Sequence, residues 1–180
     1  MTTVIDLPVS TLPFRIDPIR PSDRADVQRL FAACSDATVQ NRFRARLPAF
    51  PARHLDELLA GPPERHDALA VRGRADGKLI ALGSLAAPYH GSDGRTAELG
   101  LLVVDGWQRR GVGRALIAAL VARAARRGTS RLVAEVPHGR GALLQAMGRG
   151  LPLLSRTCDR DGLTGTFAIP APASLYRLEP

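Results

Sequence analysis

The sequence of 180 residues predicts one α/β (α+β) domain. Apolar residues recur at helical intervals before residue 61 and alternate, as in strands, from residue 67. The segment 96–136 places an apolar strand, a long amphipathic helix and another strand in succession, which is the order of two parallel strands joined by a crossover helix. The length suits one hydrophobic core, and the sequence contains no internal repeat and no visible domain boundary.

The first half of the chain predicts a strand and three helices. Residues 14–20 alternate enough to form a short strand. A helix follows, with Ser22 as its expected N-cap and one apolar stripe on its surface. A second short helix begins at Ser35, and a third covers residues 51–60 and ends at Gly61. The stripe of the first helix consists of Val27, Leu30, Phe31 and Cys34.

The second half predicts strands arranged around one long helix. Residues 67–73 and 78–86 flank the dipeptide Asp76-Gly77, which favours a tight hairpin. The strand at 96–104 is apolar almost throughout, so we expect it to be central. The remaining elements are a helix at 112–127, a strand at 130–136, a short helix at 139–148 and a closing strand pair at 151–157 and 163–169.

We expect the domain to span residues 13–170, between a loose leader at 1–12 and a tail at 171–180. The first residues lack the basic and then apolar pattern of a secretory signal, and no apolar run approaches the roughly 20 residues of a membrane span. Cys34 and Cys158 do not have the spacing of a disulfide framework or a zinc cluster, and the histidines show no metal-ligand spacing. These observations predict a cytoplasmic protein with no metal and no membrane segment.

Arginine carries almost all of the positive charge. The chain has 25 Lys and Arg against 17 Asp and Glu, a net charge of +8, and Lys78 is its one lysine. A guanidinium stays protonated and binds phosphate through two parallel hydrogen bonds. Only 4% of the residues are aromatic, so the chain lacks the stacking side chains of single-stranded nucleic-acid binders. The composition favours a phosphorylated small ligand or an acidic partner over nucleic acid.

The stretch QRRGVGRAL, which begins at Gln108, lies between the apolar strand and the long helix. Gly111 and Gly113 allow a tight turn in which the N–H groups of residues 109–114 point at one anion. The spacing excludes a dinucleotide-binding fingerprint, which needs a third glycine, and a P-loop, which needs a following Gly-Lys pair. The alternative is a plain strand-to-helix turn with solvated arginines. Those arginines are Arg109, Arg110 and Arg114.

This arrangement resembles the acetyl-CoA-binding signature of the GNAT-type (Gcn-related) N-acetyltransferases, Q/R-x-x-G-x-G/A. The opening IRPSD at 19–23 and the run AELGLLVVDGWQRRGVGRAL at 97–116 resemble the same superfamily. The resemblance implies a single-domain GNAT fold, with a mixed, mostly antiparallel sheet, a splayed central parallel pair and helices on both faces. It also implies acetyl-CoA as cosubstrate and no metal.

The resemblance further implies where acetyl-CoA binds. The pantetheine arm would lie in the gap of the splayed pair and form backbone hydrogen bonds with the apolar strand, and the pyrophosphate would bind the N–H groups of the glycine turn. The implied strand residues are Leu101, Leu102 and Val103. The implied turn residues are Arg109, Arg110, Gly111, Val112, Gly113 and Arg114.

Glu98 is the candidate catalytic base. A carboxylate in an otherwise apolar strand is costly unless it is solvated or used, and burial raises its pKa toward the value that a general base needs near neutrality. The alternative is an ion pair with a nearby arginine such as Arg95. GNAT enzymes with Ala-Glu at this point use that glutamate to take a proton from the acceptor ammonium, and here the residues are Ala97-Glu98.

Two features depart from the family pattern. Arg140 stands where many GNAT enzymes have an asparagine, and the tyrosine often found on the following helix is absent, because the tyrosines are Tyr89 and Tyr176. His138 follows the second parallel strand and is the candidate that protonates the departing thiolate or shuttles protons through water. The alternative is that His138 is an exposed loop histidine without a role in the reaction.

The predicted function is acetyl transfer from acetyl-CoA to a primary amine. The segments CSDATVQNRF at 34–43 and HLDELL at 54–59 resemble the GNAT domains of bacterial protein-lysine acetyltransferases, and a basic chain suits a substrate protein with an acidic surface. The alternatives are a small-molecule amine as acceptor, and a CoA-binding module without turnover. We expect a monomer or homodimer that binds no nucleic acid, because the arginines are spread along the chain.

Overall fold

The computed structural model describes residues 12–89 and 93–171, so most of the expected leader and tail lies outside the described residues. These residues form one seven-stranded sheet in the order β1-β2-β3-β4-β5-β7-β6. The pair β4 and β5 is parallel and every other neighbouring pair is antiparallel, as expected. The strands are β1 (Phe14–Pro18), β2 (His66–Gly73), β3 (Leu79–Ala86), β4 (Thr96–Val103), β5 (Arg131–Val136), β6 (Leu153–Cys158) and β7 (Leu163–Ala168).

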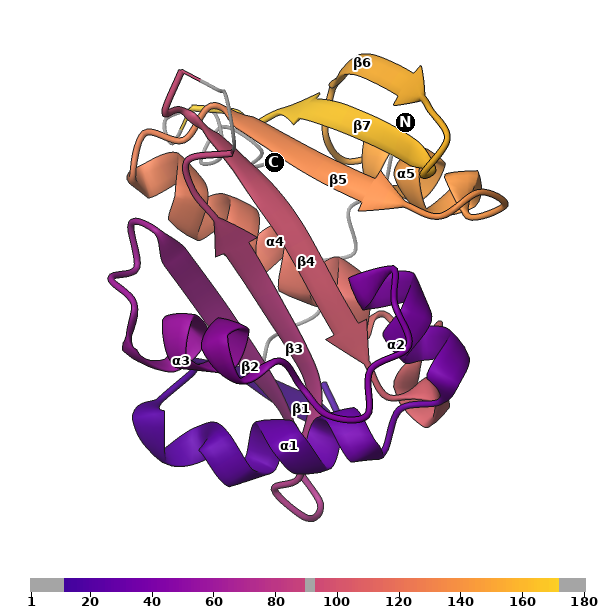
Figure 1. Ribbon diagram of the computed structural model, residues 1–180. Helices are drawn as coiled ribbons and strands as arrows, with labels where there is room; N and C mark the ends of the chain where they lie inside the picture. The colour runs from indigo at the N-terminus through magenta and orange to yellow at the C-terminus, as the bar shows by residue number, and fades with distance from the viewer. Residues whose placement is uncertain (1–11, 90–92, 172–180) are drawn as a thin grey trace.

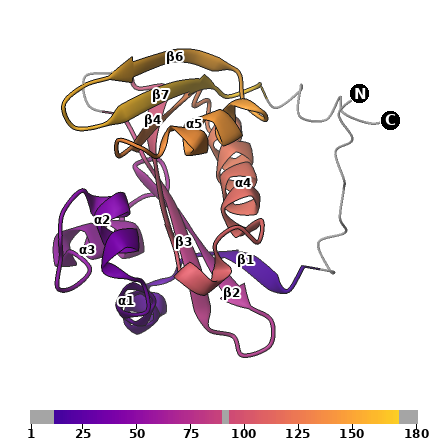
Figure 2. The ribbon, with the colours of Figure 1, turned by 90° about the vertical axis from the view of Figure 1, so that its right-hand side faces the viewer.

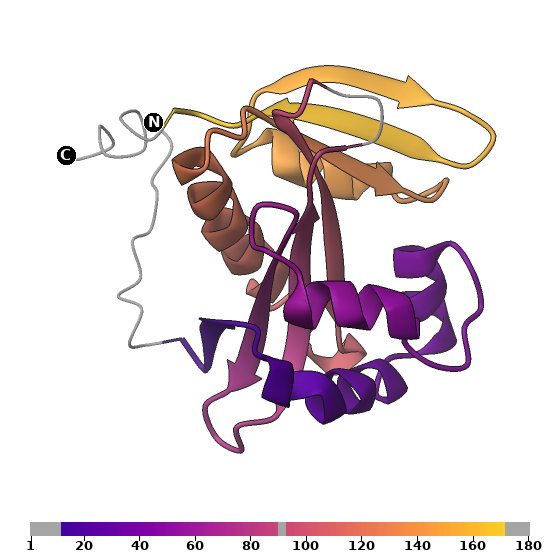
Figure 3. The ribbon, with the colours of Figure 1, turned by 60° about the vertical axis from the view of Figure 1, so that its left-hand side comes forward.

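Helices cover both faces of the sheet. Three of them lie on one face and α4 lies on the other, with α5 beneath β5 and β7 (Figure 2). Figure 3 shows the same layers from the other side. No described helix is both long and apolar enough to cross a membrane. The helices are α1 (Arg24–Ala32), α2 (Asp36–Phe43), α3 (Ala52–Ala60), α4 (Val112–Arg126) and α5 (Gly141–Gly148), with short 3₁₀ turns at Pro21–Asp23 and Asp105–Trp107.

The start of α1 differs from the sequence prediction. Ser22 lies inside a 3₁₀ turn and is not the N-cap, because α1 begins at Arg24 and follows Asp23. The Asp23 carboxylate accepts a hydrogen bond from the backbone N–H of Arg20 at 2.9 Å and pairs with Arg72 of β2 at 2.6 Å. These two contacts hold the chain in the turn and delay the helix.

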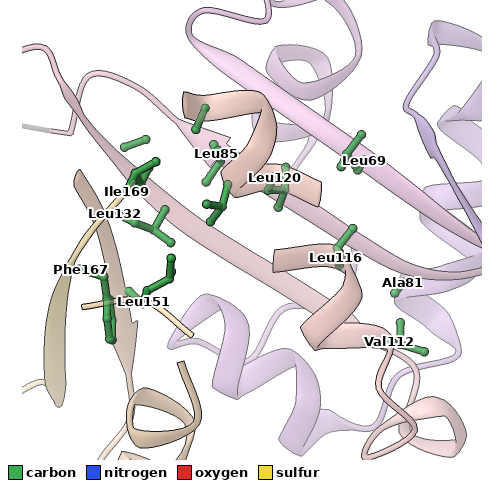
Figure 4. Close-up of a cluster of buried hydrophobic side chains, with 14 of the residues drawn as sticks. Leu69, Ala81, Leu85, Val112, Leu116, Leu120, Leu132, Leu151, Phe167 and Ile169 are labelled. Atoms are coloured by element: carbon green, nitrogen blue, oxygen red, sulfur yellow. The ribbon is translucent and has the colours of Figure 1, made fainter. Parts of the chain in front are cut away.

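A hydrophobic core lies on each side of the sheet. On the α4 side, Leu116 and Leu120 of the helix point toward the sheet, among Leu85, Leu132 and Phe167 (Figure 4). The other core joins the sheet to α1, α2 and α3. Alternate side chains of a strand point to opposite faces. The two cores therefore show which way each residue of β4 points.

The direction of Glu98 follows from its neighbours on β4. Ala97, Leu99 and Leu101 belong to the core on the α4 side, whereas Leu102 belongs to the core beneath α1, α2 and α3. Glu98 has the same parity as Leu102. Its side chain therefore faces the three N-terminal helices, on the opposite side of the sheet from α4.

The C-terminal end of α4 is anchored to the sheet by a buried carboxylate. Asp67 of β2 accepts hydrogen bonds from Arg123 Nε at 2.8 Å and from Arg127 Nη1. Burial alone would raise the pKa of Asp67, but the hydrogen bonds and charges of the two arginines outweigh it and hold the pKa below its ordinary value of 3.8.

The parallel pair separates directly after Glu98. Register pairs between β4 and β5 run from Thr96 opposite Arg131 to Glu98 opposite Val133 and then stop. Beyond that point β4 continues along β3 as far as Val103, while β5 continues along β7. The two strands diverge visibly in Figure 1. The edge of β4 that follows Glu98 is thus not paired with β5, and we refer to this divergence of the two strands, which the resemblance implied, as the gap.

Candidate active site

The turn before α4 has the geometry of an anion cradle. Gly111 precedes the helix in the left-handed region with φ of 82°, and Arg109 also has a positive φ of 58°. The first N–H groups of a helix have no intrahelical acceptor, and Gly111 has no side chain that could cap them. These donors point out of the helix N-terminus, where the helix dipole favours negative charge.

Positively charged side chains also lie around the N-terminus of α4. The first turn of α4 contains no acidic residue, and three arginines surround it. None of the three has a carboxylate partner in the described part of the chain, and Arg110 instead lies over the ring of Trp107 at 5.6 Å. Cations at a helix N-terminus oppose the helix dipole, so a bound anion would relieve the repulsion. The three are Arg109, Arg110 and Arg114.

Gly113 leaves open space over the first turn of α4. It has ordinary helical backbone angles, and a Cβ built on it would meet no protein atom within 4 Å. The fold itself therefore does not require glycine here. A close approach of ligand to backbone would require it. The cradle fits the pyrophosphate of CoA in charge and in the free space over the backbone.

The gap lies beside this cradle. Leu101, Leu102 and Val103, the residues implied to pair with pantetheine, occupy the β4 edge that β5 leaves. The side chain of Gln108, at the start of the glycine motif, donates a hydrogen bond to the Val103 carbonyl at 3.0 Å. A carbonyl oxygen has two lone pairs, so this bond leaves one acceptor position free.

The same turn is attached to α2. The carboxylate of Asp105 accepts hydrogen bonds from the backbone N–H of Ser35 at 2.9 Å and from the Thr38 hydroxyl at 2.9 Å. The side-chain amide of Gln108 donates to the Thr38 hydroxyl at 3.0 Å. Ser35, at which the sequence predicted this helix to begin, is the N-cap of α2, which starts at Asp36. The helix that lies over Glu98 is therefore fixed to the loop that would hold the CoA phosphates.

Glu98 sits where the gap opens and is half-buried. Burial raises the pKa of its carboxyl above the ordinary value of 4.5, and the nearby charge of Glu135 raises it further. Arg42 and Arg44 act in the opposite direction. The alternative ion pair with Arg95 is wrong, because Glu98 forms no ion pair with any described residue.

Glu135 of β5 is a site residue that the sequence analysis missed. Its carboxylate accepts a hydrogen bond from the hydroxyl of Tyr89 at 3.0 Å and pairs with Arg44 Nη2 at 3.2 Å. Arg44 also donates to the Asp161 carbonyl at 3.2 Å. The alternation of β5 contained the signal, since its apolar residues face the α4 side and Glu135 must then face the side of Glu98. The contacts themselves come from segments far apart in the sequence.

His138 is exposed in the loop after β5, and its Nε2 lies 3.3 Å from the Arg160 carbonyl. It forms no hydrogen bond or ion pair with the described side chains of Glu98, Glu135, Arg42 or Arg44. Arg140, at the family's asparagine position, precedes α5 and is exposed. Among the residues described, no group of three or more His, Cys, Asp or Glu side chains could hold a metal ion.

Comparisons with known proteins agree with this geometry. A model of the Acetyltransferase (GNAT) family matches residues 29–144, more than half of the chain. The GNAT domain of S. lividans PAT is 25% identical, with a TM-score of 0.77 over 86% of this chain and 90% of that one.

Two structures with acetyl-CoA bound share the fold. One is yncA, a putative acetyltransferase from Salmonella typhimurium, which is 17% identical with a TM-score of 0.68 over 89% of this chain and 95% of that one. The other is a phosphinothricin acetyltransferase from Sinorhizobium meliloti, which is 14% identical with a TM-score of 0.66 over 89% of this chain and 89% of that one. A search of the curated proteins found no match. The turn that forms the anion cradle, the divergence of β4 and β5, and the family match together show that the chain belongs to the GNAT family of acetyltransferases, enzymes that use acetyl-CoA as cosubstrate.

Proposed function

We propose that this chain acetylates a primary amine at the gap between β4 and β5, by direct attack of the amine on the thioester. The observation that carries the proposal is the position of Glu98, a carboxylate that stands where the two strands separate. It faces α2, away from α4, whose first turn forms the anion cradle. The two substrates would therefore reach the gap from opposite sides of the sheet.

The chain's own residues suit CoA as a ligand. The N–H groups of residues 109–114 and the flanking arginines would bind the pyrophosphate, and the β4 edge from Leu101 to Val103 would hold the pantetheine arm. When bound, acetyl-CoA supplies an activated acetyl thioester.

Glu98 is the proposed general base. Its carboxylate takes a proton from the acceptor ammonium, either directly or through a water molecule. The free amine then attacks the thioester, and as the carbon–sulfur bond breaks the nitrogen releases its second proton to solvent and the amide forms. Burial and the charge of Glu135 raise the pKa of Glu98 and so increase its proton affinity. Arg42 and Arg44 keep the pKa from rising further.

His138 is the proposed proton donor to the departing thiolate. It follows the end of β5, on the side where the strands have separated, and it is exposed to solvent. Both ring nitrogens of a histidine can carry a proton, so the side chain can relay one from water.

The proposed acceptor is a lysine side chain on a protein. Its support is the likeness of residues 34–59 to bacterial protein-lysine acetyltransferases and the net charge of +8, which suits an acidic partner surface. Four acids lie near the supposed acceptor loops. Asp36 forms no ion pair with a described residue, and arginines of the chain bind the other three, so these loops offer few free carboxylates to a polycation. These ion pairs are Asp56 with Arg24, Glu57 with Arg53, and Asp93 with Arg131.

The proposed compartment is the cytoplasm. Two free cysteines, Cys34 and Cys158, suit its reducing conditions.

The test is incubation of the purified protein with acetyl-CoA and a cytosolic extract, followed by mapping of acetyl-lysines by mass spectrometry. A Glu98→Gln variant is the control for chemical acetylation. We expect protein sites whose acetylation depends on the active enzyme. Turnover of small amines alone would assign a small-molecule acceptor, and CoA binding with no turnover of any amine would assign a binding module.

A further inference from the structure

Arg42 in the last turn of α2 lies against β4 next to the proposed base. Its guanidinium carbon is 5.1 Å from the centre of the Phe43 ring, and its other side contacts the backbone of Gly100. A Cβ at residue 100 would lie 2.0 Å from Nη2 of Arg42, so only glycine leaves room for this contact. The guanidinium thus lies against β4, on the side of the sheet that α2 covers.

This guanidinium has no acceptor in the described part of the chain: it forms neither an ion pair nor a hydrogen bond there. Arg44, two residues on, is satisfied by Glu135 and by the Asp161 carbonyl. A guanidinium has five N–H donors, and taking them out of water without acceptors costs free energy. Among the described side chains, the one nitrogen or oxygen both sealed from solvent and unpartnered is Nδ1 of His66. The unpartnered donors of Arg42 are therefore not sealed from solvent, and a ligand could reach them.

Arg42 and Glu98 are close enough to act on one molecule. Residues 98 and 100 of β4 point to the same face and are about 7 Å apart along the strand. Glu98 feels the charge of Arg42 without forming an ion pair with it, so the carboxylate stays available. Arg44 pairs with Glu135, whereas Glu98 and Arg42 have no ion pair in the described part of the chain. An acceptor with one ammonium and one carboxylate would complement both charges.

We propose that Arg42 forms a carboxylate-binding subsite, so that the acceptor carries a carboxylate beside the amine that is acetylated. The inference rests on the proposed function, because that function places the amine at Glu98. Carboxylates bind guanidinium groups through two parallel hydrogen bonds. The carboxylate belongs to a free amino acid or to an acidic residue next to the acceptor lysine of a protein. Both sources present the same group to Arg42.

The first measurement is the ratio of kcat/KM values for matched acceptors. One series compares free amino acids with their primary amides, and the other compares short peptides containing Glu-Lys with the same peptides containing Gln-Lys. We expect the wild-type enzyme to prefer the carboxylate in one series by about tenfold or more. The series that shows the preference identifies the source.

Variants connect the preference to Arg42. Arg42→Met removes the charge and should bring the ratio close to one, whereas Arg42→Lys should keep part of the preference. Gly100→Ala should displace the guanidinium while Arg42 is still present, and so lower the ratio independently. The control is Arg46→Met, because Arg46 lies outside the site and lines a cavity of about 300 Å³ with Asp36 and Leu47. It should retain the wild-type ratio.

A second measurement is independent of acetyl transfer. Calorimetry with glutarate, which has carboxylates and no amine, should show binding to the wild-type and Arg46→Met proteins in the presence of CoA, and loss of binding in Arg42→Met. Glutarate binding through Arg42 without turnover of any amine would leave the subsite standing and refute the proposed function. Amine acetylation with no carboxylate preference, or with a preference that survives in both Arg42→Met and Gly100→Ala, would overturn the subsite.

Discussion

The backbone geometry of Gly113 makes it possible to test a binding role of this glycine without disturbing the fold. The left-handed φ of Gly111 would strain any other residue, so a substitution there would confuse folding with binding. Gly113 has ordinary helical angles, and a Cβ added there would meet no protein atom within 4 Å, so a side chain fits without strain. It is therefore the position at which the phosphate cradle can be tested without disturbing the fold.

Gly113→Leu should fold with an unchanged or higher Tm, because glycine is a poor helix former, and should bind CoA at least tenfold more weakly, about 1.4 kcal/mol. The physical reason is that the side chain occupies the space over the first turn of α4 that the pyrophosphate needs. Calorimetry with CoA measures the loss. Wild-type affinity for CoA in a folded Gly113→Leu protein would show that the cradle does not bind the pyrophosphate.

His138→Gln separates the two proposed proton transfers. If His138 protonates the thiolate, the variant should lose at least tenfold in kcat and should keep its affinity for CoA. Steady-state kinetics and calorimetry with CoA on both proteins measure this. Wild-type kcat in the variant would mean that water protonates the thiolate.

Site residues could be proposed from the sequence where the signal was local. The glycine spacing and an acid in an apolar strand are visible in short stretches, and they led to Gly111, Gly113 and Glu98. Glu135 and Arg42 were missed, because they join the site only when β5 and α2 fold against β4. Tyr89 was dismissed for lying on the wrong element, yet its hydroxyl donates to Glu135.

At the scale of elements, α4 is the helix on which the cradle depends, and its far end is anchored to the sheet. Asp67 lies beneath that end, and Arg123 and Arg127 cover it. Losing the carboxylate would leave two partly buried guanidinium groups without their partner. This cost exceeds that of a surface ion pair, because Asp67 is almost fully buried.

Asp67→Asn should lower the free energy of unfolding by about 2 kcal/mol at neutral pH, after allowance for the solvent exposure of both arginines. The folded pKa of Asp67 is depressed, so its contribution is fully present above its ordinary value of 3.8 and is lost as the pH falls through the lower folded pKa. Denaturation from pH 7 to 2 should show the difference between wild type and variant shrinking in that acid range.

Asp56→Asn is the matched control for that experiment. Asp56 pairs with Arg24, and both side chains are exposed, at 60% and 48%. Its removal should change stability by no more than about 0.5 kcal/mol. Equal effects of the two substitutions would show that the contacts of Asp67 do not anchor α4.

Most elements were predictable because each has a local pattern. The hairpin, the long helix and the parallel pair are confirmed. Ser22 was wrongly expected to cap α1, because Asp23 is held by Arg72 from β2, a contact invisible to local sequence. The position of β7 between β5 and β6 was not predicted either. Strand order depends on pairing between distant segments, and short patterns do not encode it.

For the whole molecule, the excess of arginine predicts how a protein acceptor is captured. A net charge of +8 attracts an acidic surface over about one Debye length, which is ~8 Å at 0.15 M ionic strength. The KM for a protein acceptor should therefore rise as salt increases beyond that concentration, while the KM for a small neutral amine should change little. Steady-state kinetics across a salt series checks this, and equal salt dependence for both acceptors would argue against electrostatic capture.

If Glu98 is the base in acetyl transfer at the gap, the variant Glu98→Gln should lose that function. The measurement is kcat by CoA release across pH, with CoA affinity measured in parallel by calorimetry. Wild-type activity should rise with pH through the pKa of Glu98, which lies above the ordinary 4.5 because of burial and Glu135. The variant should lose about 10²-fold or more in kcat, lack that limb and bind CoA as wild type does. Wild-type turnover with an unchanged pH profile in Glu98→Gln would contradict the account.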